Sequence, residues 1–319
     1  MGLADPDTFD TLARSYRREL YVHCYRMLGS VLDAEDIVQE TFLRAWRARG
    51  TYRHHASPRT WLYRIATHAC LTAVSRRARR MLPEDLRAPV EEVAWLEPYP
   101  DSLLDGVADT ALGPEALFDQ REATELAFVA ALQHLPPRQR AVLLLRDVLG
   151  LSVTEVAEHL GSTAASVSSA HQRARATLAQ RWARRVASER SLTPVQRRLL
   201  EQYVESWERG DLDALVALLT EDVVLSMPPM AEWFAGRQSV RTFFSWAWSP
   251  AGPGPFRLLP VGANAQPAFG LYGRTPDGSG FTPQAIQVLT LADERIARVH
   301  GFVKPDLFPV FGLPPRLDG

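Results

Sequence analysis

The chain has 319 residues, 46% of them hydrophobic and 23% charged, which excludes collagen-like, coiled-coil and wholly disordered proteins. It contains only two cysteines, Cys24 and Cys70, and no run of about eighteen apolar residues, so we expect neither a disulfide framework nor a membrane span. The acidic first ten residues lack the apolar core of a secretory signal, so we expect a cytoplasmic protein.

The formal net charge of −1 is distributed unevenly along the chain. Residues 1–80 carry +6, residues 81–114 carry −7, residues 115–190 carry +2 and residues 191–319 carry −2. Two basic segments therefore flank an acidic, proline-rich connector, as expected where only part of a chain meets a polyanion. These four ranges are our predicted domains: a helical domain, a linker, a second helical domain and a C-terminal domain.

The first clear amphipathic helix is predicted to begin at Asp33, which we assign as its N-cap. Apolar residues recur at helical spacing on one face, which is therefore predicted to be buried. The opposite face carries mixed charge, and from the pattern alone solvation explains such a face better than docking of a partner does. Its residues are Asp36, Gln39, Glu40, Leu43, Arg44 and Arg47.

A polar loop over 49–56 leads into a second helix, which begins at Ser57 and Pro58 as a cap and a first-turn proline. Aromatic and hydrogen-bonding groups share one of its faces, and four arginines close it. This combination suits base stacking beside phosphate contact, although arginines at a helix C-terminus also complement its dipole. The candidate DNA-binding residues here are Tyr52, Arg53, Trp61, Arg64, His68, Arg76, Arg77, Arg79 and Arg80.

Residues 81–114 show no sustained periodicity, and we predict a linker whose aromatic stretch 95–100 docks on another part of the chain. The clearest helical pattern of the sequence follows this linker. Ser152 and Glu155 form a predicted capping box, Gly161 ends that helix, and a second amphipathic helix begins at Ser162 or Thr163.

Two short amphipathic helices around a glycine predict a helix-turn-helix, whose second helix enters the major groove of DNA; the alternative is an ordinary helical hairpin. Glutamine and arginine suit adenine and guanine edges. The candidate DNA-binding residues of this segment are Thr163, Ser168, Ser169, Gln172, Arg173 and Arg175.

Both helical segments, in this order, resemble bacterial RNA polymerase sigma factors of the extracytoplasmic-function (ECF) type over about the first 190 residues. The stretch 33–46 is similar to the helix that binds the clamp of the polymerase β′ subunit in that family. The stretch 61–71 is similar to the helix that melts the promoter and reads the −10 element, and loop 49–56 would then hold an extruded base. Residues 135–142 are similar to the start of the second sigma domain, and 167–175 to the helix that reads the −35 element.

The resemblance implies core RNA polymerase, through its β′ clamp and β flap, and promoter DNA as partners. Many family members carry basic side chains where this chain has Ser168 and Ala170, so their base preference is not transferred. The acidic linker fits the family's habit of threading this segment through the polymerase toward the RNA path.

The last segment reads as α+β, with helices first and a curved antiparallel sheet afterwards. It resembles the SnoaL-like, nuclear-transport-factor-like cone fold, which a subgroup of these sigma factors carries at the C-terminus. The predicted fold class is therefore multidomain, with two all-α sigma domains before an α+β cone. Helices are predicted from Thr193, over 211–219 and over 239–248, and strands from Val223, over 268–274, 284–291 and 296–303.

A cone of this kind can enclose a pocket for an unidentified small molecule, although aromatic residues at these spacings are more often core. The candidate lining residues are Trp207, Trp233, Phe244, Trp248 and Tyr272, with Asp222 and His300 as candidate acid or base. No metal-ligand spacing, phosphate-binding loop or nucleophile elbow appears in the sequence. We therefore expect no catalytic residues, no cofactor and no metal.

The sequence thus favours a sigma factor that directs core polymerase to specific promoters, with a C-terminal domain that regulates its activity in cis. One alternative is a ligand-binding helix-turn-helix regulator that acts without polymerase. A second is a cyclase- or isomerase-like enzyme fused to a DNA-binding module.

Overall fold

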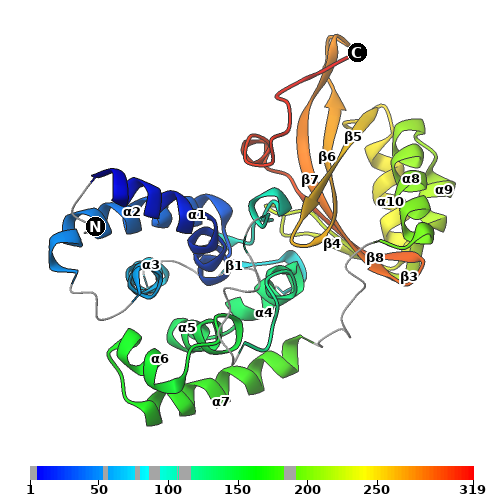
Figure 1. The fold of residues 1–319 in the computed structure, drawn as a ribbon. Coiled ribbons are helices and arrows are strands. Elements are labelled where there is room, and N and C mark those ends of the chain that lie inside the picture. The colour runs from blue at the N-terminus through cyan, green and yellow to red at the C-terminus, as the bar shows by residue number, and fades with distance from the viewer. Residues whose placement is uncertain are drawn as a thin grey trace. The chain divides into compact units, whose positions relative to one another are not determined.

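The structure of the chain is a computed structural model that describes residues 6–52, 57–75, 80–85, 94–105, 107, 116–182 and 192–319. The chain divides into two compact units (Figure 1). The first comprises 1–81, 90–99 and 103–184, and the second comprises 82–89, 100–102 and 185–319. The predicted linker is therefore shared between the two units.

The first unit is mainly helical, with one short parallel ladder formed by the linker. Its helices are α1 (Pro6–Leu28), α2 (Val31–Ala48), α3 (Pro58–Val74), α4 (Leu126–Gln133), α5 (Pro137–Leu143), α6 (Val153–Leu160) and α7 (Ala164–Arg181). The shorter elements are the 3-10 turns η1 (Arg49–Thr51) and η5 (Glu122–Thr124), the π-turn η6 (Leu144–Val148) and the strands β1 (Arg80–Met81) and β2 (Ala94–Trp95).

The helix caps follow the predicted chemistry with one exception. Ser57 and Thr163 cap α3 and α7, and Ser152 forms a complete capping box at the start of α6. The assignment of Asp33 as the cap of α2 is wrong, because the hydroxyl of Ser30 accepts a hydrogen bond from the Asp33 amide and the helix starts at Val31. Asp33 lies instead in the first turn, where the helix dipole favours a carboxylate.

The aromatic stretch of the linker docks within the first unit, as predicted. The Tyr99 ring is fully buried, with its centroid 5.4 Å from that of Tyr21 and 4.8 Å from that of Tyr25. The Tyr25 hydroxyl donates to the main-chain oxygen of Glu97 at 2.8 Å. This part of the linker is therefore held on α1.

Helices α1 and α3 pack against η5 and α6 through buried polar groups. Arg26 donates to the main-chain oxygen of Ala123 at 2.9 Å. The Nε2 atoms of His23 and His159 lie 3.0 and 3.3 Å from the same hydroxyl, that of Thr67. Burial lowers the pKa of His23 to about 3 and that of His159 to about 4, so both imidazoles are neutral at pH 7.

The second unit combines helices with a seven-stranded sheet. Its helices are α8 (Pro194–Arg209), α9 (Leu212–Ala217) and α10 (Arg237–Ala247), with the 3-10 turns η2 (Pro83–Asp85) and η7 (Pro305–Leu307). Its strands are β3 (Leu219–Ser226), β4 (Trp233–Ala235), β5 (Phe256–Ala263), β6 (Gln266–Arg274), β7 (Gly280–Ala292), β8 (Arg295–Phe302) and β9 (Leu317–Asp318).

The strand order is β4-β3-β8-β7-β6-β5, and β9 pairs with β7. Within this sheet, only the β3–β8 pair is parallel. Helices α8, α9 and α10 lie on one side of the curved sheet (Figure 1), so their apolar faces and this face of the sheet enclose the core. This arrangement is the α+β cone that the sequence predicts; β4, β5 and β9 are additions to the predicted strands.

The other face of the sheet is covered by the C-terminal segment. The Tyr272 ring packs against Phe308, with centroids 5.1 Å apart, and the Tyr272 hydroxyl donates to the main-chain oxygen of Pro314 at 2.8 Å. Gly270 leaves room for Leu313, because a Cβ at position 270 would lie 2.5 Å from a Leu313 methyl. Both faces of the sheet are therefore buried at its centre.

Candidate nucleic-acid and polymerase interface

The mixed-charge face of α2 is accessible. Leu43 is 57% exposed at its middle. Asp36, Gln39, Arg44 and Arg47 are also exposed, and Glu40, half-buried, pairs with Arg44. The opposite face packs inward as predicted, through Ile37, Val38, Thr41 and Ala45. Exposed ion pairs contribute little to stability, so the sequence of this face is not explained by folding alone.

The N-terminal part of α3 presents an aromatic surface next to polar groups. The Trp61 and Tyr52 ring centroids lie 5.0 Å apart, and both side chains are half-buried. Arg64 and His68 follow on the same side of the helix and are exposed. The His68 Nε2 atom also lies 3.0 Å from the main-chain oxygen of His159. The structure thus brings four of the predicted residues together at one surface.

Of the predicted DNA-binding arginines in this region, the structure describes only Arg80 and, on α3, Arg64. Arg53, Arg76, Arg77 and Arg79 lie outside the described residues. Arg80 is described and is used internally, since its guanidinium group pairs with Asp33 and donates to the main-chain oxygen of Trp95 at 2.7 Å. Only 17% of its side chain is exposed.

Helices α6 and α7 form the predicted helix-turn-helix. The Ser152 amide donates to Glu155 Oε2 at 2.7 Å, and the Glu155 amide donates to Ser152 Oγ at 3.2 Å. Hydrogen bonds from Ser152 to the Glu155 carboxylate, first of all that of the Ser152 amide, hold the pKa of Glu155 below its usual value. Gly161 ends α6 at φ 58°, a left-handed conformation that favours glycine. Val167 of α7 is buried, so the two helices share a core.

The outer face of α7 is exposed where the sequence predicts DNA contact. Ser169, Gln172, Arg173 and Arg175 are exposed, Thr163 is exposed while capping the helix, and Ser168 is half-buried at the flank. Arg173 Nη1 donates to Ser169 Oγ at 2.5 Å. Among the residues that the structure describes, a partner that binds Arg173 therefore has to compete with this exposed hydroxyl.

Sequence analysis did not single out Asp147, which lies in η6 and is buried. Its Oδ1 atom lies 2.7 Å from Nε2 of His171 on α7. The available signal was a carboxylate within the apolar run 141–149, where an ionised group needs a partner.

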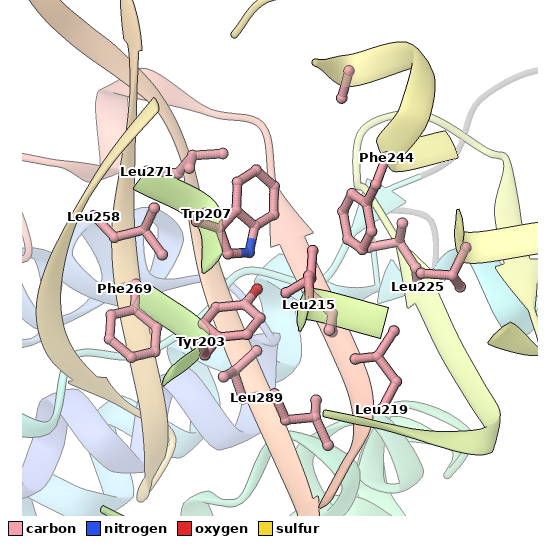
Figure 2. Close-up of a cluster of buried hydrophobic side chains, with 14 of the residues drawn as sticks. Tyr203, Trp207, Leu215, Leu219, Leu225, Phe244, Leu258, Phe269, Leu271 and Leu289 are labelled. Carbon is pink, nitrogen blue, oxygen red and sulfur yellow. The ribbon is translucent and has the colours of Figure 1, made fainter. Parts of the chain in front are cut away.

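The expected pocket residues of the second unit do not line one cavity. Trp207 and Phe244 belong to the core cluster of buried side chains (Figure 2). Trp207 packs edge-on against Phe244 and Trp248, with centroids 5.2 Å apart in each case. These rings fill the centre of the cone, which is the structural alternative that the sequence left open.

The other expected pocket residues lie elsewhere. Tyr272 and His300 are on the opposite face of the sheet, and Asp222 and Trp233 are exposed on β3 and β4. The expected juxtaposition of His300 with the aromatic cluster is therefore wrong, because neighbouring strand residues such as Val299 and His300 point to opposite faces.

His300 meets the linker instead. Its Nδ1 atom lies 2.9 Å from Ser226 Oγ and 3.5 Å from a carboxylate oxygen of Glu84 in η2. Arg298 lies 3.7 Å from the same oxygen. Burial lowers the pKa of His300, and the negative charge of Glu84 acts in the opposite direction.

A second stretch of the linker is fixed on the β5–β6 hairpin. The Ala265 amide donates to Asp101 Oδ1 at 2.8 Å, and Pro100 forms a bridge with Ala263. A Cβ at Gly262 would lie 2.5 Å from Asp101 Oδ2, so the close approach requires glycine there. The second unit thus holds the linker at two places.

A groove of about 760 Å³ runs between the outer side of α8 and the β5–β6 hairpin. Leu200, Val204, Pro260 and Phe269 are among its lining residues. Over the described ranges, no three histidine, cysteine or carboxylate side chains gather as a metal site requires. No helix in the described part of the chain is long and apolar enough to cross a bilayer.

Comparison with known proteins agrees with this geometry. Residues 12–80 match the model of Sigma-70 region 2, residues 125–178 that of Sigma-70, region 4, and residues 200–299 that of the SnoaL-like domain. ECF RNA polymerase sigma factor SigG of Mycobacterium tuberculosis is 44% identical over 97% of this chain and 85% of its own length.

SigJ, a second ECF RNA polymerase sigma factor of Mycobacterium tuberculosis, is 28% identical over 94% of this chain and 93% of its own. A crystal structure of SigJ shares the fold, with a TM-score of 0.61 and 23% identity over 98% of this chain and 100% of that one.

The chain therefore belongs to the ECF RNA polymerase sigma factors and carries a C-terminal SnoaL-like domain. This membership confirms the resemblance of the two helical segments and of the C-terminal segment. It favours the sigma factor over a regulator acting without polymerase and over a fused enzyme.

Proposed function

We propose that this sigma factor binds the β′ clamp of core RNA polymerase through the exposed face of α2. The observation that carries the proposal is the position of Leu43, 57% exposed between charged side chains on a helix whose other face is buried. An apolar group within a charged rim is the usual centre of a protein interface. Since the polymerase works in the cytoplasm, we assign the protein to that compartment.

The promoter is read at two places in this proposal. The Tyr52 and Trp61 rings stack an extruded base of the −10 element, with Arg64 and His68 beside it. Helix α7 enters the major groove at the −35 element, where Gln172 and Arg173 contact base edges. The second helical region also contacts the β flap.

Binding of core polymerase tests the docking face. Leu43→Glu replaces an exposed apolar side chain by a charge, and we expect a loss of affinity of at least tenfold with unchanged thermal unfolding. Trp246→Glu is the matched control, because Trp246 is 52% exposed on the second unit. Equal affinity of Leu43→Glu and the unmodified chain would contradict the proposal.

We also propose that the SnoaL-like domain regulates transcription in cis by holding the linker. The contacts of Glu84 with His300 and of Asp101 with Ala265 support this role, since both linker residues lie on the domain's own sheet. A linker fixed at two places has fewer conformations available for passage through the polymerase.

The test combines linker substitutions with a truncation near Ala187. Glu84→Gln with Asp101→Ala should change the amount of transcript made with the full chain and have no effect in the truncated chain. Asp222→Asn, at an exposed position of β3, is the control. An equal effect of the linker substitutions in both chains would contradict regulation through these contacts.

A further inference from the structure

Asp147 is a buried carboxylate in the segment that precedes the helix-turn-helix. It lies in η6, a π-turn between α5 and α6, and only 2% of the residue is exposed. Its main-chain oxygen accepts hydrogen bonds from the Leu117 and Phe118 amides at 2.7 and 3.0 Å. The main chain of the residue is therefore fixed by the segment that precedes α4.

The Asp147 side chain reaches two successive turns of α7. Its Oδ1 atom lies 2.7 Å from Nε2 of His171, and its Oδ2 atom lies 3.9 Å from Nε of Arg175. Oδ2 is buried and makes no hydrogen bond within the described part of the chain. Since a buried carboxylate oxygen is costly without a partner, Arg175 is the group that compensates it.

This contact restrains the arginine without closing a hydrogen bond. The Nε atom of Arg175 lies 3.9 Å from Oδ2, and 58% of the Arg175 side chain is exposed. The guanidinium group, a planar fork of N–H donors, is thus accessible on the same helix as the exposed Gln172 and Arg173. A fork of this kind matches the two oxygens of a DNA phosphate.

We propose that Asp147 is a positioning residue for promoter recognition: through His171 it sets the rotation of α7, and through Arg175 it directs a guanidinium fork to a backbone phosphate of the upstream element. The inference rests on the proposed reading of that element by α7. Asp147 itself does not touch DNA.

Removing the charge of Asp147 distinguishes a positioning role from a purely electrostatic effect on the affinity for DNA. Asp147→Asn removes a negative charge from a DNA-binding domain, so Coulomb attraction alone would strengthen binding of DNA. Positioning predicts the reverse, a loss of about tenfold in affinity of the reconstituted holoenzyme for promoter DNA. Glu158→Gln, at an exposed position of α6, removes the same charge without touching α7 contacts and is the matched control.

A double-mutant cycle measures whether Asp147 acts through Arg175. Arg175→Gln should weaken binding about tenfold for every upstream sequence and reduce the salt dependence of log affinity by about one phosphate contact. Asp147→Asn should add little in the Arg175→Gln background. Additive losses, or unchanged binding by Asp147→Asn, would overturn the proposal.

Arg175→Lys tests the same idea without disturbing the buried carboxylate. Lysine keeps the charge and lacks the fork, so we expect most of the loss seen with glutamine; binding equal to that of the unmodified chain would overturn the proposal.

Arg173→Ala separates this inference from the proposed function. If Arg173→Ala weakens binding while Asp147→Asn and Arg175→Lys do not, only the positioning role fails; if none of them affects promoter binding, the proposed reading of DNA by α7 fails as well.

Discussion

Glu84 Oε1 lies 3.5 Å from His300 Nδ1, so an acidic side chain of the linker is paired with a buried histidine of the SnoaL-like domain. The Ser226 hydroxyl lies 2.9 Å from the same nitrogen. Linker residues 82–85 and 100–102 thus belong to the folded C-terminal unit, and this pair holds the first of these stretches on its sheet.

The stability of the first unit should fall as the pH falls below about 6.5. In the folded protein, burial holds the pKa of His23 at about 3 and that of His159 at about 4, so the unfolded chain binds protons that the folded chain does not. At pH 5 the loss is about 2 kcal/mol for each histidine. Hydrogen exchange at the amides of α3, corrected for its intrinsic pH dependence, measures this loss of stability. His159→Gln should remove about half of the loss between pH 7 and pH 5. An unchanged pH dependence of stability in that variant would contradict the lowered pKa of His159.

Trp207→Ala should lower the free energy of unfolding of the second unit by about 3 to 5 kcal/mol, because it leaves a cavity among packed aromatic rings. Urea denaturation followed by hydrogen exchange at α8 reports on this unit. Trp246→Ala is the control, since an exposed side chain should change the stability by less than about 0.5 kcal/mol. Similar losses in both variants would show that the core is placed wrongly.

Gly262→Ala should release Asp101 from the β5–β6 hairpin. A Cβ at this position would lie 2.5 Å from Asp101 Oδ2, so the carboxylate has to move and the Ala265 amide loses its acceptor. We expect faster hydrogen exchange at that amide. Gly50→Ala, where an added Cβ has no neighbour within 4 Å, is the matched substitution, and equal protection of Ala265 in both variants would argue against the contact.

Arg173→Ala should weaken binding of the holoenzyme to its preferred upstream element by about 1 to 3 kcal/mol and relax the preference at one base pair. Competition between promoter variants measures the preference directly. A loss of equal size on every sequence would make Arg173 a phosphate contact rather than a base contact.

Local chemistry made much of the fold predictable. The capping box of Ser152, the left-handed Gly161 and the apolar spacing around Val156 are short-range features, and they predict the helix-turn-helix from the sequence alone. The exposed face of α2 followed from the same periodicity. The sequence did not predict strand β5, because Pro260 and Gly262 interrupt the alternation of apolar and polar residues that marks a strand.

Contacts between residues distant in the chain were not predictable. Nothing near Glu84 or Asp101 in the sequence indicates that they meet His300 and the β5–β6 hairpin. The side of the sheet to which His300 points depends on the register of β8, which is shifted relative to both of its neighbours. The pairing of Asp147 with His171 likewise depends on how η6 and α7 pack together.

Run-off transcription with purified core polymerase tests the central claim most directly. The full chain should start transcription at a specific promoter, and Leu43→Glu should not, although both fold equally well. Promoter-specific transcript at the same level with Leu43→Glu, or none with the full chain on any promoter of a genomic library, would contradict the account.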